Sequence, residues 1–201
     1  MELESIDGIR YLKVDSPQEV IPYRAGFVGA YQTIFREPPY SERFFPAEAE
    51  AVLQRVLQTP GHITLLAVSG NRRVVGFGAG VPLGSRSDVH RDMHGLLPVQ
   101  HTFYLAELGV LPEYRGRGVG STLVRKRLEL IDRQVYTHVV LRASVRHQDV
   151  WEMYTSMGFE DIGVYQEVAS RRVDGQVRTD RRLFLSRVLE REEELAPDSE
   201  D

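Results

Sequence analysis

The stretch VLPEYRGRGVGSTLVRKR, residues 110–127, has the composition of an anion-binding loop. Three glycines alternate in it with larger residues: Gly116, Gly118 and Gly120. Glycine lets the backbone approach a ligand closely, and the first N–H groups of the helix expected from about Gly118 have no intrahelical partner. Arg115 and Arg117 add charge-assisted donors. These residues predict a phosphate site at a helix N-terminus; the alternative is a turn that only reverses the chain.

Two common nucleotide-binding motifs do not fit this loop. A P-loop requires Lys-Ser or Lys-Thr after its last glycine, and no such pair follows here. A dinucleotide-binding loop would have a third glycine at Ser121 and an acidic residue at the end of the next strand, where the sequence has Ala143 and Ser144. The loop alone therefore leaves the anion unidentified.

His90 and His94 have the i, i+4 spacing of a zinc motif. The general-base glutamate of that motif is replaced by Arg91, and the surrounding residues favour a loop over a helix. We therefore expect no metal site, and loop histidines that line an acceptor pocket are the alternative.

Composition limits the class of protein. The chain has 201 residues, 42% hydrophobic and 27% charged, which fits one domain over 1–190 with an acidic, disordered tail over 191–201. A net charge of -4 gives no sign of a nucleic-acid binder, and the absence of cysteine excludes disulfides and thiolate chemistry. No signal peptide and no apolar run of ~20 residues is present, so we expect a cytoplasmic protein that does not enter a membrane.

The elements that position the glycine loop follow from hydrophobic periodicity and turn residues. Strands are expected at 8–14, 62–68, 73–81, 102–110, 138–144, 159–168 and 181–189, and helices after Pro17, after Pro46, at 118–131 and at 150–157. Hairpins imply antiparallel pairs, and the helical crossover from 102–110 to 138–144 implies one parallel pair. The predicted class is α/β (α+β), a mixed, mostly antiparallel twisted sheet of about six to seven strands with helices on both faces. The stretch 82–101 is too long for a routine connection and is expected to be functional or mobile.

The segment from Arg115 to Gly120 resembles the R/Q-x-x-G-x-G/A loop of the GNAT superfamily of N-acetyltransferases. The preceding LAELGVLPEY is similar to the fourth strand of that family, and MYTSMGF at 153–159 is similar to its Y-x-x-x-G-F signature. The element order agrees over roughly 8–189. This resemblance implies a GNAT-like fold, acetyl-CoA as cosubstrate, no metal, and a small-molecule or peptide amine as acceptor.

The same resemblance implies a donor site. The pyrophosphate would lie on the loop amides, and the pantetheine arm would pair with the strand before the loop as another strand would. The residues so assigned are Leu108, Gly109, Val110, Arg115, Gly116, Arg117, Gly118, Val119, Gly120, Ser121 and His147. His147 stands where many members carry asparagine, and we favour for it the alternative of a surface histidine that caps a helix.

Acetyl transfer to an amine requires loss of an ammonium proton, a polarised thioester carbonyl and a proton for the leaving thiolate. Glu107, beside the expected pantetheine arm, is the candidate base, directly or through water. Its alternative is an outward-facing strand glutamate. By alternation Glu107 shares a face with Leu105 and Gly109 and lies opposite Tyr104, unless the strand is irregular.

Tyr154 matches the family tyrosine that protonates the thiolate, and a phenol of pKa about 10 suits a thiol of pKa about 8.5. The alternative for Tyr154 is a core aromatic that anchors the short helix, a role that suits Trp151 better. The resemblance implies direct transfer in a ternary complex, with the N–H of Leu108 or Val110 polarising the carbonyl.

The stretch FREPPYSE at 35–42 follows a predicted helix, where family members often shape the acceptor site. Tyr40, Glu37 and Glu42 are candidates to hold the amine, and solvated charges in a turn are the alternative. A homodimer is a common family assembly. Two other functions remain open: transfer from another acyl-CoA, and a non-catalytic acyl-CoA-binding or sensor module.

Overall fold

The computed structural model describes residues 1–190; the expected tail at 191–201 lies outside the described residues. The strands are β1 (Glu2–Ile6), β2 (Ile9–Lys13), β3 (Ile63–Ser69), β4 (Arg73–Pro82), β5 (Thr102–Val110), β6 (His138–Ser144), β7 (Glu160–Arg171) and β8 (Val177–Val188). The α-helices are α1 (Pro17–Val20), α2 (Arg24–Arg36), α3 (Pro46–Leu57), α4 (Ser87–Met93), α5 (Val119–Leu130) and α6 (Gln148–Ser156). Short 3-10 turns are η1 (Ile21–Tyr23), η2 (Leu83–Ser85), η3 (Val99–His101) and η4 (Pro112–Tyr114).

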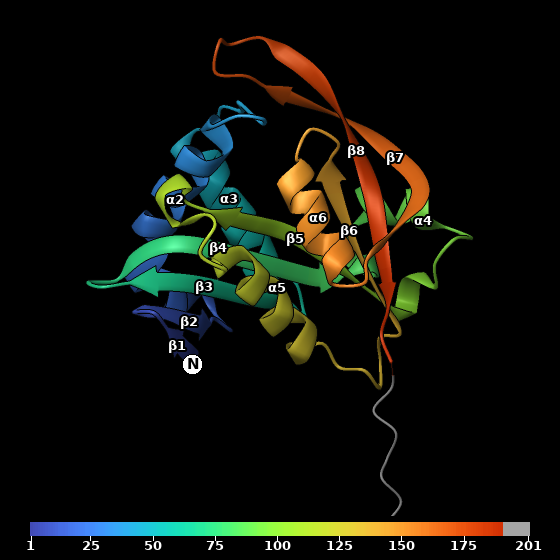
Figure 1. Cartoon of the computed structure of the whole chain (residues 1–201), viewed down its shortest axis with the longest axis horizontal. Helices are drawn as coiled ribbons and strands as arrows, with labels where there is room; N and C mark the ends of the chain where they lie inside the picture. Colours follow the sequence, from blue (N-terminus) through green and yellow to red (C-terminus); the bar gives the residue numbers. More distant parts are fainter. Residues whose placement is uncertain (191–201) are drawn as a thin grey trace, which may run out of the picture.

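Within residues 1–190 the strands form one eight-stranded sheet in the order β1-β2-β3-β4-β5-β6-β8-β7 (Figure 1). Only β5 and β6 pair in parallel among these neighbours, which confirms the mixed, mostly antiparallel prediction. The predicted count of six to seven strands is too low. The missing strand is β1, a mostly exposed edge strand whose residues carry almost no apolar alternation.

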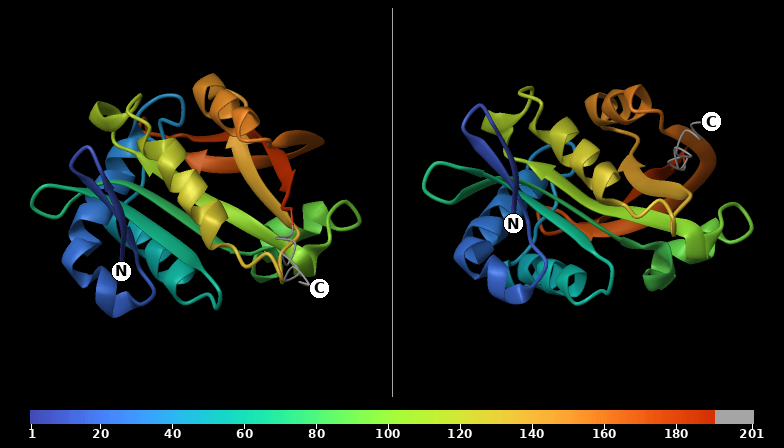
Figure 2. Two further views of the ribbon diagram at one scale, coloured as in Figure 1. Left: turned by 60° about the horizontal axis from the view of Figure 1, so that its bottom comes forward. Right: turned by 90° about the horizontal axis from the view of Figure 1, so that it is seen from below.

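Helices cover both faces of the sheet, as predicted. In both views of Figure 2, α2 and α3 lie on one face and α5 and α6 on the other. On the first face Phe27 and Tyr31 of α2 pack on Phe77 of β4, with ring centroids 4.8 and 5.5 Å apart. On the second face α5 buries Val119 and Leu123. The sheet is therefore the middle layer between two helical layers.

Local sequence signals explain where the helices begin. The hydroxyl of Ser16 accepts a hydrogen bond from the N–H of Glu19, and Pro17 occupies the first turn of α1. Pro46 opens α3, where the Glu48 carboxylate accepts from the N–H of Phe45 at 2.7 Å. Both predicted helix starts are confirmed.

The stretch 82–101 is structured rather than a simple loop. It contains η2, α4 and η3, and Val89 and Met93 are completely buried. His90 lies inside α4, so the expectation of a loop around His90 and His94 was wrong. The described residues contain no group of three potential metal-ligating side chains. In the described part of the chain no helix is both long and apolar enough to cross a membrane.

The β7–β8 hairpin is longer than predicted, with twelve residues in each strand. Its far end curls over the end of the molecule near α2 (Figure 1). There the N–H of Arg43 donates to the carbonyl of Arg171 at 2.8 Å, and the N–H of Val173 donates to the carbonyl of Ser41 at 3.0 Å. The segment between α2 and α3, residues 37–45, and the β7–β8 hairpin are therefore joined and form one wall at this end of the molecule.

Candidate active site

The two parallel strands separate halfway along β5. Their pairing runs from Thr102–His138 to Leu105–Leu141 and stops there. A cavity of about 1000 Å³ opens where β5 and β6 diverge, lined by both strands, by the start of α5, by α6, and by the wall formed from the post-α2 segment and β7–β8. Backbone groups of β5 beyond Leu105 therefore face this space without a β6 partner.

The glycine loop lies at one end of this cavity. Gly116 and Gly118 have φ of +71° and +76°, values that favour glycine, and Gly118 immediately precedes α5. Within residues 1–190 no acceptor is found for the backbone N–H groups from Gly116 to Ser121. A run of free N–H groups at a helix N-terminus fits an anionic group such as a pyrophosphate.

Most of the predicted donor-site residues line the cavity: Leu108, Gly109, Val110, Arg115, Gly116, Gly118, Val119, Gly120, Ser121 and His147. Arg117 does not line it, because its guanidinium lies over the Tyr114 ring, 5.5 Å from the centroid. Arg115 donates to the carbonyl of Val110 at 3.1 Å, which ties the loop to the end of β5.

Glu107 owes its orientation to a β-bulge. The register shifts between the pairs Ala79–Glu107 and Val81–Tyr104, so Gly80 of β4 stands opposite two residues of β5. An extra residue reverses the alternation beyond it. Glu107 and Tyr104 consequently lie on the same face, that of α2 and α3. Regular alternation would have placed them on opposite faces, so the irregularity named as the exception is present here.

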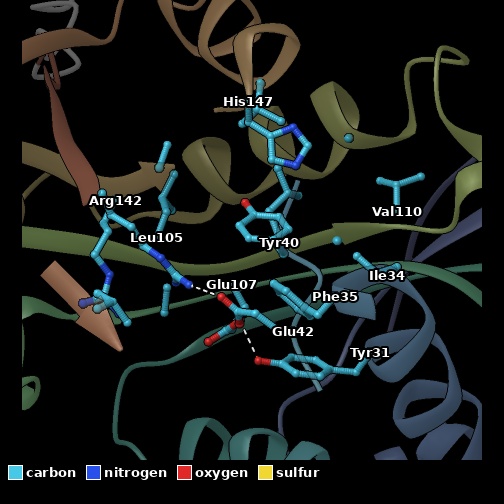
Figure 3. Close-up of a pocket in the computed structure, with 18 of the residues that line it drawn as sticks. Tyr31, Ile34, Phe35, Tyr40, Glu42, Leu105, Glu107, Val110, Arg142 and His147 are labelled. Carbon is cyan, nitrogen blue, oxygen red and sulfur yellow. Dashed lines mark hydrogen bonds and ion pairs between the residues drawn. The ribbon is translucent and has the colours of Figure 1, made fainter. Parts of the chain in front are cut away.

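The Glu107 side chain is half-buried and lines the cavity, so it is not an outward-facing glutamate on the sheet surface. The Tyr31 hydroxyl donates to its Oε2 at 3.3 Å, as Figure 3 shows. Burial raises the pKa of Glu107 above 4.5, although the charges of Arg86, Arg142 and Arg182 and the Tyr31 hydrogen bond oppose the rise. A carboxylate with a raised pKa is a better proton acceptor near neutral pH.

Tyr154 reaches the same cavity from α6 on the other face of the sheet. Its ring is buried and makes an edge contact with Phe159, with centroids 5.4 Å apart. Burial raises the pKa of Tyr154, and the charge of Arg127 opposes the rise. Tyr154 is thus also the buried anchor of α6, and the expectation that Trp151 takes that role was wrong, since Trp151 is only half-buried.

Sequence reasoning missed Arg127, which is completely buried in α5. Its Nε donates to the carbonyl of Leu123 at 3.1 Å, and its Nη1 donates to the carbonyls of Ala79 and Glu107, both at 3.0 Å. A Cβ at Gly78 would lie 2.8 Å from this Nε, so glycine makes room for the guanidinium. The signal was available: an arginine four residues after Leu123 falls on the apolar face of the predicted helix.

His147 precedes α6, but its side chain makes no capping hydrogen bond. Its half-buried ring packs against Tyr40, with centroids 4.8 Å apart, and burial lowers its pKa. The capping interpretation was therefore wrong. Of the acceptor candidates after α2, Tyr40 and Glu42 line the cavity, whereas Glu37 is exposed outside it.

Comparison with known proteins gives a consistent result. Residues 28–159 match the Acetyltransferase (GNAT) family. N-acetyltransferase 8F1 of Rattus norvegicus is 33% identical over 98 residues, which cover 49% of this chain and 39% of that protein. The probable N-acetyltransferase family 8 member 5 of Mus musculus is 37% identical over 65 residues, which cover 32% of this chain and 29% of that protein. The chain thus spans well under half the length of these curated relatives.

Solved structures share the fold. The crystal structure of Arabidopsis thaliana NAA60 in complex with acetyl-CoA superposes with a TM-score of 0.60 and 16% identity, covering 90% of this chain and 98% of that one. At this identity the likeness concerns the fold.

Proposed function

Because the chain belongs to the Acetyltransferase (GNAT) family, we propose that it moves the acetyl group of acetyl-CoA to an amine by direct transfer in a ternary complex. The observation that carries the proposal is the single cavity that joins three features: the free N–H groups before α5, the Glu107 carboxylate and the Tyr154 phenol.

The donor would enter along the α5 and α6 side. The amides from Gly116 to Ser121 would hold the pyrophosphate, and the β5 backbone beyond Leu105 would hydrogen-bond the amide-bearing arm as a neighbouring strand would. An N–H of Leu108 or Val110 would polarise the thioester carbonyl.

The acceptor would enter from the opposite side, where the post-α2 segment and the β7–β8 hairpin form the wall. Glu107 takes one proton from the ammonium, and the free amine attacks the thioester carbonyl to form the C–N bond. The C–S bond then breaks, the thiolate takes a proton from Tyr154, and the second amine proton restores the phenol through solvent.

Calorimetric titration with acetyl-CoA, CoA and NAD tests the donor half of the proposal. The two CoA species should bind and NAD should not, and Gly118→Asp should abolish CoA binding because it adds a strained side chain and a negative charge at the anion site. Gly8→Asp is the matched control, since Gly8 has the same φ of +76° in the β1–β2 turn. CoA binding that survives Gly118→Asp would place the donor elsewhere.

Measurement of turnover tests the catalytic half of the proposal. CoA release can be followed with a thiol reagent free of protein background, because the chain contains no cysteine. Acetyl-CoA binding without release of CoA in the presence of any amine would leave a binding module instead of an enzyme.

A further inference from the structure

The acceptor side of the cavity holds several charges around Glu107, and most of them are already paired. Arg86 forms a bidentate pair with Asp88, at 2.9 Å for both contacts. Arg182 donates to Glu42 at 2.5 Å, and Glu42 is only 4% exposed. Within each pair the two charges neutralise each other, so neither pair offers a free anion or a free cation to a substrate.

Two half-buried charged groups of the same region, Glu107 and Arg142, stand outside these pairs. The exposed Arg43 and Arg55 also line the cavity without a carboxylate partner in the described chain, but their charges face solvent. Within residues 1–190 no arginine, lysine or histidine nitrogen lies within 4.0 Å of the Glu107 carboxylate, which takes its hydrogen bond from Tyr31 instead. Arg142 of β6 likewise has no carboxylate within that distance in the described chain; its Nη1 donates to the neutral Oε1 of Gln166. Both side chains line the cavity (Figure 3).

The position of Arg142 is well defined. Gln166, its partner on β7, donates in turn to the carbonyl of Asp88 at 2.9 Å, which ties the arginine to α4. The Arg142 charge reaches Glu107, where it lowers the carboxyl pKa. A half-buried guanidinium that is held by a neutral amide keeps donors for a further carboxylate, its preferred partner.

We propose that the acceptor is a small zwitterion, a primary amine that carries a carboxylate, with its ammonium on Glu107 and its carboxylate on Arg142. This inference rests on the proposed function and names its substrate class. One half-buried unpaired anion and one half-buried unpaired cation in a common cavity match such a molecule, whereas a simple amine would leave Arg142 without a counter-charge. Phe35, Tyr40 and Phe44 pack together beside Glu107 and provide an aromatic wall for an apolar body.

The bonds that change are those of the proposed transfer, and the carboxylate takes no part in them. Glu107 accepts one ammonium proton, the amine nitrogen bonds to the acetyl carbon, and the carbon–sulfur bond breaks. Arg142 only orients the acceptor. A peptide would present an amide where Arg142 expects a carboxylate, so a free amino acid should be preferred over the same residue in amide form.

The test uses two matched triplets: phenylalanine, phenylalaninamide and phenylethylamine, and leucine, leucinamide and 3-methylbutylamine. Binding to the CoA-saturated full chain is measured by calorimetry, and kcat and KM by CoA release. A charge-assisted hydrogen bond contributes about 1.5–3 kcal/mol, so the amino acid should exceed its decarboxylated amine by roughly 10- to 100-fold in kcat/KM. Arg142→Gln should remove this preference mainly through KM.

The control is Arg181→Gln, since Arg181 lies on β8 outside the cavity, over the Tyr165 ring at 4.2 Å. It should keep the preference of the wild type. Equal use of amine and amino acid, or a preference that survives Arg142→Gln, overturns the inference. Equal use of the amide overturns it in favour of a peptide acceptor. Loss of acetyl-CoA binding itself, by contrast, counts against the proposed function. In that case, amino acid binding to the CoA-free protein shows whether the inference about the acceptor fails as well.

Discussion

The hydroxyl of Tyr31 on α2 lies 3.3 Å from Oε2 of Glu107 on β5, two residues separated by 76 positions in the chain. The hydrogen bond stabilises the ionised carboxylate and so lowers the pKa of Glu107 against the effect of burial. Tyr31 is itself buried, and its pKa is raised well above 10.0, so the phenol stays protonated as the donor.

Tyr31→Phe should therefore move the acidic limb of the kcat/KM profile to higher pH, because loss of the hydrogen bond lets burial raise the pKa of Glu107 further. The ring stacking on Phe77 is kept in this variant, so the change isolates the hydroxyl. The pH profile of CoA release is the measurement. An unshifted limb would remove Glu107 from the proton-transfer step or Tyr31 from its control.

Glu107→Gln should reduce kcat by about 10²- to 10⁴-fold, the usual contribution of a general base. The same substitution should stabilise the fold at neutral pH. The folded pKa of Glu107 is raised above 4.5, so its favourable contribution is complete below 4.5 and is lost as the pH rises through the folded pKa. In thermal unfolding, the Glu107→Gln variant should have a higher Tm than the wild type at pH values above the folded pKa, and the same Tm below pH 4.5. A Tm difference that does not change with pH would contradict the raised pKa.

Tyr154→Phe should lower kcat by roughly 10²-fold if the phenol protonates the thiolate. The affinity for acetyl-CoA should stay near that of the wild type, because the ring and its edge contact with Phe159 remain. Steady-state kinetics with parallel calorimetry separates the two quantities. An unchanged kcat would leave Tyr154 as a core residue only.

Arg127→Met should lower the free energy of unfolding by about 1–3 kcal/mol, the cost of leaving a buried acceptor unsatisfied. The carbonyls of Ala79 and Glu107 lose their donor, and removal of a buried cation offsets part of that loss. Urea unfolding measures the difference. Because Arg127 bridges the strands at the bulge, kcat should fall as well, with acetyl-CoA affinity kept, while Lys126→Met on the partly exposed face of α5 should leave kcat unchanged.

The elements of the proposed donor half of the site could be predicted from sequence because they are local. Strand β5, the turn at Gly116 and Gly118, and the start of α5 follow one another over about twenty residues, and each has a recognisable short-range signal. The order of the other strands and helices could be predicted for the same reason. Strand β1 could not be predicted, because an exposed edge strand has almost no apolar alternation to recognise.

The acceptor half depended on contacts between distant segments. The bulge opposite Gly80 that turns Glu107 toward α2 is a property of the β4–β5 pair, and no pattern within β5 specifies it. The pairing of Arg182 with Glu42, 140 positions apart, is invisible in a linear sequence.

The sequence by itself determined the fold class, the glycine loop before α5 and the choice of the candidate acid and base, since these depend on periodicity, turn residues and short motifs. The tertiary structure decided which charges remain free to meet a substrate. Nothing in the sequence distinguishes the charge of Arg86 from that of Arg142. Their partners in space do: the carboxylate of Asp88 neutralises Arg86, whereas Arg142 donates to the neutral amide of Gln166. Charge pairing is decided by distance in space, which the order of residues along the chain does not contain.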